Sequence, residues 1–445
     1  MAARIVILGG GFAAIATTQR LERLLRADEA EIVLISRENF SLFTPMLPEV
    51  SSGALDVRHI VTPVRSQLKR ARFVLAEVDA FDARARSVTY THTLTGMTES
   101  IRYDHLIVAL GSSTSTFGLP GIAERAFALK TLEDAGILRN RFMWLLELAD
   151  SARDEAERRR LLTLVVVGGG FTGVETAGEM VELFRSVERF YPHVEREDIR
   201  IALIEGGPAL LPGLPARMGS YSANALARRG VEIVLGDNVK AADEDGLELQ
   251  SGRRIETRTI VWSAGVRPSP IVAAADLPHG KSGAIVVDAQ MRVNGFEDLW
   301  AIGDCAAISD GKGGSYPQTA QHAIREGPVL AHNVVAAIRG QAGKPFRYDS
   351  LGMMASLGAR KAVAQLPGDR VLTGFLAWVL WRGYYLSRLP GLERKLRVAF
   401  DWMLELVFPR DISELRVYTR RAQSSAAVDA GLAPRDETMP PFNRL

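Results

Sequence analysis

The sequence predicts an α/β fold made of two Rossmann-like units, followed by an amphipathic helical segment near the C-terminal end. Two glycine-rich stretches, "LGGGFAAIA" at 8–16 and "VGGGFTGVE" at 167–175, each follow a short apolar run and precede a helix-forming stretch. Apolar residues at helical spacing over 392–408 predict the third part. A chain of 445 residues fits two or three domains.

The composition excludes several classes of protein. The net charge is only +2, so no general attraction to nucleic acid is expected. Cys305 is the single cysteine; it cannot form an intrachain disulfide, and we expect it to be a small buried residue. The histidines show no spacing typical of zinc, so no metal site is expected. The best apolar run, 371–381, has 11 residues, whereas a membrane-spanning helix needs about 20.

The first glycine-rich stretch has the pattern of a phosphate-binding turn. Gly9, Gly11 and Ala14 follow the predicted strand 4–8 in G-x-G-x-x-A register. The first glycine allows the turn, the second lets a pyrophosphate approach the backbone, and the small third residue lets helix and strand pack closely. The helix that follows supplies amide donors to phosphates. The next strand, 31–36, ends at Ser36-Arg37, which alone would suggest a clamp for a 2′-phosphate.

The second stretch is the stricter match. Gly168, Gly170 and Gly173 are in full G-x-G-x-x-G register after the strand 164–167. A later strand ends at Glu205, whose carboxylate can accept hydrogen bonds from both ribose hydroxyls of an adenine dinucleotide. No arginine follows it, which favours NAD over NADP. The two stretches together predict two dinucleotide sites.

Three further motifs resemble those of the two-dinucleotide-binding-domain flavoproteins. "DLWAIGDCA" at 298–306 resembles their late FAD motif, in which the aspartate, here Asp304, binds the flavin ribityl chain. "YDHLIVALGS" at 103–112 resembles their middle motif, and "TIVWSAGVRP" at 259–268 resembles the matching motif of the NADH half. Their order implies an NADH domain inserted into an FAD domain. The expected parts are an FAD domain at 1–117 and 280–350, an NADH domain at 118–279, a C-terminal membrane-associating region at 351–421 and a disordered tail at 422–445.

Three longer stretches narrow the resemblance. Residues 38–56, 316–327 and 374–411 resemble the type II NADH dehydrogenases, which are single-chain, non-proton-pumping NADH:quinone oxidoreductases of respiratory electron transport. The resemblance implies FAD as cofactor, NADH as substrate and a quinone as acceptor. A single cysteine also separates this chain from the disulfide reductases and the sulfide:quinone reductases, which need cysteine pairs.

The resemblance carries residue roles onto matching positions. For FAD it implies contacts from Gly9, Gly10, Gly11, Phe12, Ala13, Ser36, Arg37, Thr44, Val78, Ala109, Gly111, Gly303, Asp304, Ala320 and Gln321. For NADH it implies contacts from Gly168, Gly170, Thr172, Gly173, Glu175, Glu205, Ala264 and Gly265. It implies catalytic roles for Glu175, Gln321 and Arg325. In the family, Glu175 would orient NADH or relay protons; the alternative is a first-turn carboxylate favoured by the helix dipole.

The chain departs from the family pattern in two places. Ser36 stands where many members have an acid for the ribose, so Arg37 is expected to take part in that contact. The quinone signature A-Q-x-A-x-Q reads A-Q-H-A-I-R at 320–325. Arg325 could donate to a quinone carbonyl and stabilise an anionic product; alternatively it pairs with Glu326 or another acid.

The C-terminal segment predicts a membrane-binding surface. One face carries Leu392, Leu396, Ala399, Phe400, Met403 and Val407, and the other carries Arg394, Arg397, Asp401 and Glu405. Over 381–421 there are nine Lys and Arg residues against five acids. These features favour peripheral binding to an anionic membrane, at the cytoplasmic face of the cell membrane. The alternative is packing on the protein's own core or in a homodimer.

Two other functions stay open from the sequence. One is a soluble NADH-dependent flavoprotein reductase that serves a protein carrier or another acceptor. The other is a redox-sensing or structural flavoprotein in which NADH binding changes association. The resemblance favours a membrane-peripheral enzyme that passes a hydride from NADH to FAD and then two electrons to a membrane quinone.

Overall fold

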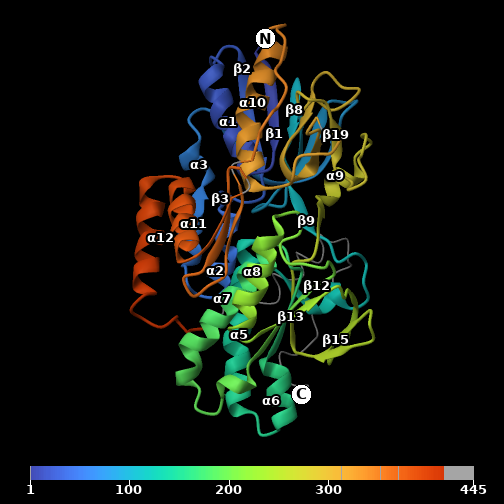
Figure 1. The fold of residues 1–445 in the computed structure, drawn as a ribbon. Coiled ribbons are helices and arrows are strands. Elements are labelled where there is room, and N and C mark those ends of the chain that lie inside the picture. The colour runs from blue at the N-terminus through green and yellow to red at the C-terminus, as the bar shows by residue number, and fades with distance from the viewer. Residues whose placement is uncertain (1, 312, 351, 369, 415–445) are drawn as a thin grey trace. The chain divides into compact units, whose positions relative to one another are not determined.

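The computed structural model describes residues 2–311, 313–350, 352–368 and 370–414 (Figure 1). These residues form two compact units: one comprises 2–42, 61–113 and 266–350, and the other comprises 43–60, 114–265 and 352–414. The predicted tail at 422–445 and the end of the region at 351–421 lie outside the described residues. None of the helices in the described ranges has the length and hydropathy that crossing a bilayer would require.

A seven-stranded sheet forms the centre of the first unit. Its strands lie in the order β20-β8-β1-β2-β5-β6-β7; neighbours from β20 to β5 are parallel, and the last two pairs are antiparallel. The bounds are β1 (Ala3–Leu8), β2 (Ala30–Ser36), β5 (Arg72–Asp82), β6 (Ser87–His92), β7 (Thr98–Arg102), β8 (His105–Val108) and β20 (Leu299–Ala301). The inner strands are apolar and buried because helices and loops cover both faces.

Two helices lie side by side on this sheet, α1 (Phe12–Leu24) and α10 (Ala320–Ile338) (Figure 1). The remaining elements are short. They are β3 (Phe40–Leu42), β4 (Val61–Pro63), α3 (Val64–Gln67), β9 (Ser112–Thr114), β18 (Val266–Pro268), α9 (Pro270–Ala274), β19 (Ile285–Val287), η5 (Gly303–Cys305) and β21 (Ala306–Ile308).

The second unit contains a five-stranded, fully parallel sheet in the order β10-β17-β11-β12-β13. Its bounds are β10 (Ala126–Ala128), β11 (Thr163–Val167), β12 (Arg200–Glu205), β13 (Val231–Leu235) and β17 (Thr259–Trp262). Two antiparallel three-stranded sheets accompany it, made of β14 (Val239–Ala242), β15 (Gly246–Leu249), β16 (Arg254–Glu256), β22 (Met354–Ser356), β23 (Ala362–Leu366) and β24 (Arg370–Gly374).

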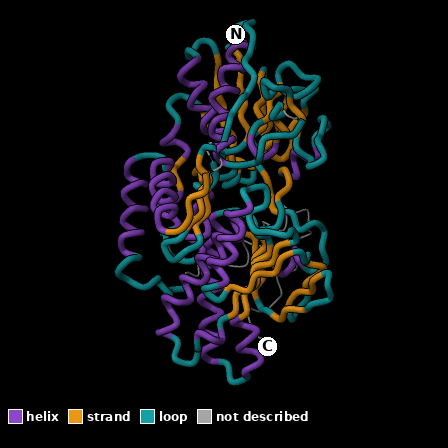
Figure 2. The backbone as a smooth tube through the Cα atoms, in the orientation of Figure 1, coloured by secondary structure: helices purple, strands orange, loops and turns teal. Residues whose placement is uncertain are grey.

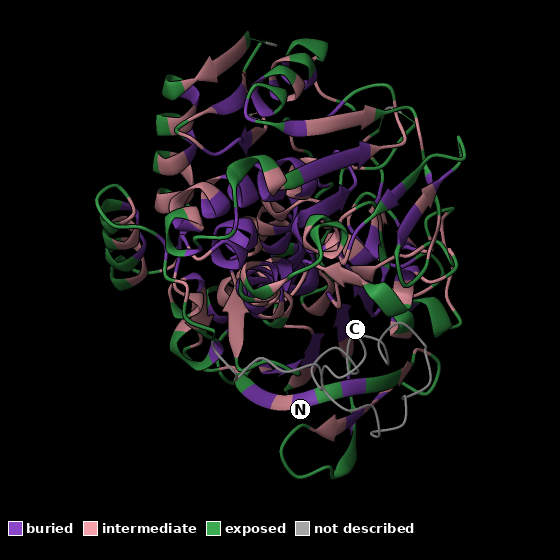
Figure 3. Cartoon of the chain, turned by 90° about the horizontal axis from the view of Figure 1, so that it is seen from below, coloured by how far each residue is buried: buried purple, intermediate pink, exposed green. Residues whose placement is uncertain are grey.

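Helices surround these sheets, as the backbone tube shows (Figure 2). They are α2 (Leu47–Ser51), α4 (Ile122–Arg125), α5 (Leu132–Ser151), α6 (Glu155–Leu162), α7 (Phe171–Val187), α8 (Ala216–Ala227), α11 (Phe375–Arg388) and α12 (Leu392–Leu404). Single 3-10 turns are η1 (Thr44–Met46), η2 (Val57–Ile60), η3 (Glu188–Phe190) and η4 (Arg196–Asp198). Buried residues concentrate on the strands and the inner helices (Figure 3).

The fold class predicted from the two glycine-rich stretches is confirmed. Each stretch lies between a parallel strand and a helix, and β2 and β12 follow at the predicted positions. The unit boundaries fall at 113/114 and 265/266, whereas the sequence placed them at 117/118 and 279/280. Residues 43–60 and 352–414 belong to the second unit. Residues 352–414 belong there because buried donors of the C-terminal segment bind glutamates of α2 and α7.

Close packing between α1 and α10 depends on one glycine. A Cβ added at Gly327 would lie 2.8 Å from the Ala16 Cβ, 2.8 Å from the Thr17 amide nitrogen and 3.0 Å from the Ala13 carbonyl oxygen. Two of these neighbours are backbone atoms, which cannot yield without moving a helix.

We expect Gly327→Ala to destabilise the chain by about 1–3 kcal/mol, because the added methyl group overpacks the helix contact. Gly383→Ala is the matched control: Gly383 is exposed in α11 with open space around its Cβ position, so alanine should stabilise by up to about 1 kcal/mol. Urea unfolding measures both variants. Equal stability of Gly327→Ala and the wild type would contradict the packing argument.

Candidate functional site

The first glycine-rich turn has the shape that a pyrophosphate requires. Gly9 has φ +106°, and a Cβ there would lie 2.3 Å from the Ala109 carbonyl oxygen. Gly11 has open space where a side chain would stand, and no side chain caps α1 within the described ranges. The first-turn amides of a 13-residue helix therefore lie beside an open backbone surface. This arrangement fits the pyrophosphate of FAD.

The predicted ribose-binding end of β2 lies directly beside this turn. A Cβ at Gly10 would lie 2.5 Å from the Ser36 hydroxyl oxygen, so the two residues are in contact distance. Ser36 is buried, and its hydroxyl accepts a hydrogen bond from the Glu38 amide. Arg37 is half exposed, with its guanidinium 3.9 Å from Glu77. Val78, which follows Glu77 on β5, is buried.

The late and middle FAD motifs meet in the same unit. The Ser112 hydroxyl donates to the Asp304 carboxylate at 2.7 Å, and Gly111, with φ +65°, stands just before Ser112. A Cβ at Gly303 would lie 3.4 Å from the Ala13 Cβ, so this motif reaches the first turn of α1. Asp304 is therefore placed to accept hydrogen bonds from a ligand in this cradle.

Cys305 lies inside the core of the first unit. It is fully buried, and its thiol donates to the backbone carbonyls of Ile302 and Val108. Burial raises the pKa of the Cys305 thiol to about 12, so the reactive thiolate does not form near neutral pH. The prediction of a small, buried, inert cysteine agrees with this environment.

The predicted quinone signature forms a small polar and aromatic cluster. The Tyr348 hydroxyl donates to the side-chain oxygen of Gln321 at 3.1 Å. The Arg325 guanidinium donates to the backbone carbonyl of Gln321 and lies 4.3 Å from the centre of the Tyr348 ring. Arg325 thus stacks on an aromatic ring, whereas the sequence offered pairing with Glu326 as an alternative. Ala320 begins α10 beside this cluster.

Glu326 is a buried acid that sequence reasoning did not assign to the site. It accepts a hydrogen bond from the Gly303 amide at 2.7 Å. Burial raises its pKa to about 7, and the nearby Asp304 adds to the effect. The sequence did contain a signal for this buried acid: Glu326 lies on an otherwise apolar helix face, four residues after His322 of the quinone signature. Thr44, which was predicted to contact FAD, lies in η1 of the second unit.

The second glycine-rich turn is packed more tightly than the first. A Cβ at Gly168 would lie 2.7 Å from the backbone of Ala264, and one at Gly173 would lie 1.8 Å from the Gly168 carbonyl oxygen. Gly170 has open space, as Gly11 has in the first turn. Thr172 stands in the first turn of α7, where amides lie beside that space. The arrangement fits a second dinucleotide pyrophosphate.

Glu205 stands at the end of β12, where a ribose would bind. Its two carboxylate oxygens accept hydrogen bonds from the Gly169 amide at 2.6 Å and the Gly207 amide at 2.7 Å. These bonds fix the carboxylate beside the turn. A fixed negative charge at this point repels a 2′-phosphate and accepts from ribose hydroxyls.

An exposed aromatic ring covers the Ala264-Gly265 turn. A Cβ at Gly265 would lie 2.4 Å from the ring of Phe117, and this ring packs edge-on against Trp262. Phe117 has φ +53°, an unfavourable value for a bulky residue. Sequence reasoning did not identify Phe117, because only the folded chain brings it to the turn.

Glu175 is a buried acid with fixed donors. Its Oε1 accepts from the Ser356 amide at 2.9 Å and from the Trp381 indole at 3.2 Å. The side chain is 7% exposed, and burial raises its pKa to about 8, more strongly than the two donors lower it. With this raised pKa, the protonated form of the carboxyl is favoured at pH 7. The alternative of a first-turn carboxylate favoured by the helix dipole does not apply, because the first turn of α7 carries no acid.

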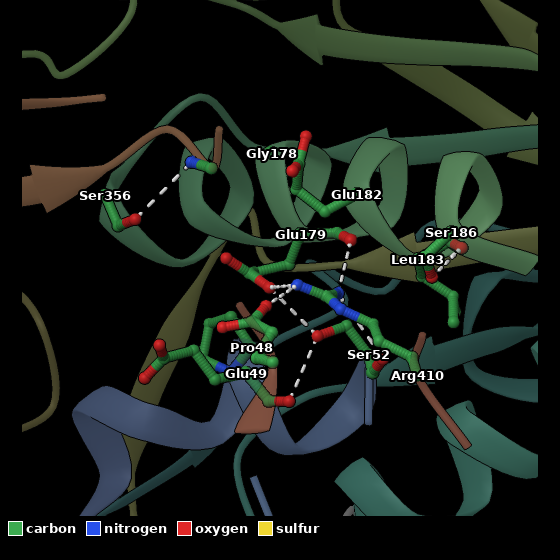
Figure 4. Close-up of polar contacts among 12 residues, drawn as sticks. Pro48, Glu49, Ser52, Gly178, Glu179, Glu182, Leu183, Ser186, Ser356 and Arg410 are labelled. Atoms are coloured by element: carbon green, nitrogen blue, oxygen red, sulfur yellow. Dashed lines mark hydrogen bonds and ion pairs between the residues drawn. The ribbon is translucent and has the colours of Figure 1, made fainter. Parts of the chain in front are cut away.

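Two more buried glutamates lie in the same unit as Glu175 and were not predicted from the sequence. Glu179, one turn further along α7, accepts from Arg410 at 2.8 Å and from the Ser52 hydroxyl at 3.0 Å (Figure 4). Glu49 on α2 accepts from the Trp402 indole at 3.0 Å. Burial is the main cause that raises the pKa of both acids. They border a cavity of about 200 Å³.

The C-terminal helices expose apolar side chains and bury part of their charged face. Leu392, Leu396, Phe400, Met403 and Val407 are 53–75% exposed. On the other face, Asp401 bonds His59 at 2.5 Å, and Glu405 pairs with Arg382 and Arg410. The sequence placed Arg394, Arg397, Asp401 and Glu405 on one face. Instead Asp401 and Glu405 point inward, and Arg394 and Arg397 stay at the surface. The described residues therefore do not cover the apolar face.

Comparisons with known proteins agree with this geometry. Residues 3–327 match the pyridine nucleotide-disulphide oxidoreductase family, and residues 351–411 match the NDH2 C-terminal domain. An internal alternative NAD(P)H-ubiquinone oxidoreductase of Arabidopsis thaliana is 34% identical, over 93% of this chain and 86% of the relative. A type II NADH:quinone oxidoreductase of Mycobacterium tuberculosis is 34% identical over 90% of this chain and 86% of the relative.

The fold is also known from an experimental structure. NDH2 of Plasmodium falciparum, solved in complex with NADH, superposes with a TM-score of 0.85 at 21% identity and covers 93% of this chain and all of that one. The chain belongs to the pyridine nucleotide-disulphide oxidoreductase family and, within it, to the type II NADH:quinone oxidoreductases. It is a flavoprotein with FAD as cofactor and NADH as substrate, and it passes electrons from NADH to a quinone.

We expect Glu205→Ala to weaken NADH binding about ten- to hundredfold, because two hydrogen bonds from ribose hydroxyls to a carboxylate are lost. FAD content should stay unchanged. Asp304→Ala, in η5 of the first unit, is the counterpart at the FAD site. It should lower FAD content, and the enzyme that keeps FAD should have an unchanged affinity for NADH. Flavin absorbance per chain and NADH titration measure the two quantities. Loss of FAD in Glu205→Ala would reverse the assignment of the two turns.

Proposed function

We propose that this chain holds FAD at the turn of Gly9 and Gly11 and binds NADH at the turn of Gly168 and Gly170. When bound, FAD accepts a hydride from NADH and gives two electrons to the quinone. The overall reaction takes NADH, a quinone and one proton to NAD⁺ and a quinol. The two electrons and one proton of the quinol come with the hydride, and the second proton must come from an acid. No proton crosses a membrane in this scheme.

The observation that carries the proposal is the burial of Glu175 beside two fixed donors, which raises the pKa of its carboxyl to about 8. A neutral carboxylic acid at pH 7 can donate a proton where a normal glutamate cannot. Its Oε1 accepts two hydrogen bonds, and a protonated oxygen is a poor acceptor, so the proton resides on Oε2. We assign Glu175 the role of proton donor to the quinone or its anion.

Gln321 and Arg325 are proposed to bind the quinone. Gln321 carries an amide that can donate to a quinone carbonyl, and the Arg325 cation can stabilise negative charge that develops on the oxygen. The Tyr348 ring beneath Arg325 holds the guanidinium in place. Glu205 supports NADH as the favoured nucleotide, although the plant relative is named for NAD(P)H.

The exposed apolar face of α11 and α12 is proposed to bind the membrane, at the cytoplasmic face of the cell membrane. Phe375, Leu376 and Val379 of α11 add to the exposed residues of α12. An uncovered apolar face of this size on two helices is typical of a membrane or protein contact. A quinone dissolved in lipid would then be delivered from the same surface. A second copy of the chain is the other occupant considered.

Quinone reduction should slow as pH rises through about 8, because the acid form of Glu175 is lost there. Below about pH 8 the carboxyl is neutral and can donate; above it the carboxylate cannot. Glu175→Gln should lower the rate of quinone reduction at least tenfold and abolish this alkaline limb. Stopped-flow reoxidation of the reduced enzyme by a short-chain quinone measures it. A limb that persists in Glu175→Gln would remove Glu175 from the role.

We expect the double variant Leu396→Glu with Phe400→Glu to weaken binding to anionic vesicles at least tenfold, because each apolar side chain contributes about 1.5–3 kcal/mol when buried. Turnover with a water-soluble quinone should be retained. Leu94→Glu is the control, since Leu94 is 85% exposed in a loop of the first unit. Vesicle sedimentation measures binding, and analytical ultracentrifugation measures association. Unchanged vesicle binding together with loss of a dimer would assign the face to a second copy.

A further inference from the structure

The C-terminal segment supplies one donor to each of the three buried glutamates. The Trp381 indole of α11 binds Glu175, the Trp402 indole of α12 binds Glu49, and Arg410 binds Glu179. Nothing in the sequence pattern of α2 and α7 alone provides these partners. A buried carboxyl without a hydrogen-bond partner is unfavourable, so these bonds decide how the acids are held.

Trp381 is itself held firmly. Its side chain is 1% exposed, and its ring packs edge-on against Tyr385 at 4.8 Å and near Trp402 at 6.2 Å between ring centres. Side chains on the opposite face of the same helix, including Phe375 and Leu376, are exposed. One helix therefore joins the exposed apolar surface to the acid.

We propose that Trp381 is a positioning residue for the reaction: its indole N–H, with the Ser356 amide, fixes Oε1 of Glu175 so that the transferable proton stays on Oε2. The inference rests on the proposed role of Glu175. It goes further by assigning a residue of the C-terminal segment to the proton-transfer step. An acid whose carboxyl can rotate presents its proton in the productive direction for only part of the time, which lowers the rate.

Other groups around Glu175 stay the same when this indole N–H is removed. Glu179 on α7 raises the pKa of Glu175 by repulsion, and the Tyr385 phenol on α11 interacts with both Glu175 and Glu49. Arg382, Glu405 and Arg410 face Glu49 and Glu179. The donor from Trp381 lowers the pKa of Glu175, so its loss moves that pKa upward.

The test uses Trp381→Phe, which removes the N–H and keeps an aromatic ring in the packed site. We expect the alkaline limb of quinone reduction to move upward by about 0.5–1 pH unit. The maximal rate should fall about two- to tenfold, while KM for NADH stays unchanged. Trp402→Phe is the matched control, because it removes the same kind of donor from Glu49. That variant should keep the limb and the rate of the wild type.

The outcomes separate the two hypotheses. A limb that moves in Trp381→Phe but not in Trp402→Phe supports the positioning role. An unmoved limb in Trp381→Phe, or equal shifts in both tryptophan variants, overturns the positioning role of Trp381. In that case Glu175→Gln still abolishes the limb if Glu175 is the proton donor. A limb that survives Glu175→Gln instead overturns the proposed role of Glu175.

A second measurement does not depend on the folding of Trp381→Phe. In the ¹⁵N-labelled wild-type holoenzyme, one tryptophan indole resonance should titrate with the pKa of the alkaline limb, and it should stop titrating in Glu175→Gln. No indole resonance following that pKa would contradict a bond between Trp381 and Glu175. Flavin content and thermal unfolding of each variant report whether it is folded.

Discussion

The cost of burying carboxyl groups is the constraint on which much of the second unit depends. Glu49, Glu175 and Glu179 lie on α2 and α7 with almost no exposure, and each must find donors or stay neutral. Apart from the Ser52 hydroxyl, the donors come from β22 and from the C-terminal segment, and these bonds hold residues 352–414 within this unit. The same burial raises the pKa of Glu175 to about 8. In the proposed function, stability and chemistry thus share one set of hydrogen bonds.

The charges of α12 follow from the same constraint. An ordinary surface helix turns its charges outward, yet Asp401 and Glu405 turn inward because His59, Arg382 and Arg410 are there to pair with them. Val398 and Trp402 of α12 are buried, whereas Leu392, Leu396, Phe400 and Met403 are left exposed. An exposed apolar face of this kind is typical of a membrane or protein contact. The partner proposed for it is a membrane, which would also contain the quinone.

The sequence predicted the parts that obey local rules. Glycine spacing after a strand identifies both turns, because the steric demand of a pyrophosphate falls on a few consecutive residues. The family resemblance pointed to Glu175 and Gln321, whose roles stay predictions. By contrast, Phe117 over Gly265, Glu326 under Gly303 and the donors of Glu49 and Glu179 come from residues far apart in the chain. No local pattern encodes such contacts, and the inward turn of Asp401 and Glu405 was missed for the same reason.

The most direct test of the account is steady-state turnover of the FAD-loaded chain, with NADH and NADPH compared across short-chain ubiquinone and menaquinone analogues. The account predicts oxidation of NADH with at least one quinone, one quinol formed per NADH, and much slower oxidation of NADPH because of Glu205. Negligible turnover with every quinone in a sample that contains one FAD per chain would contradict it.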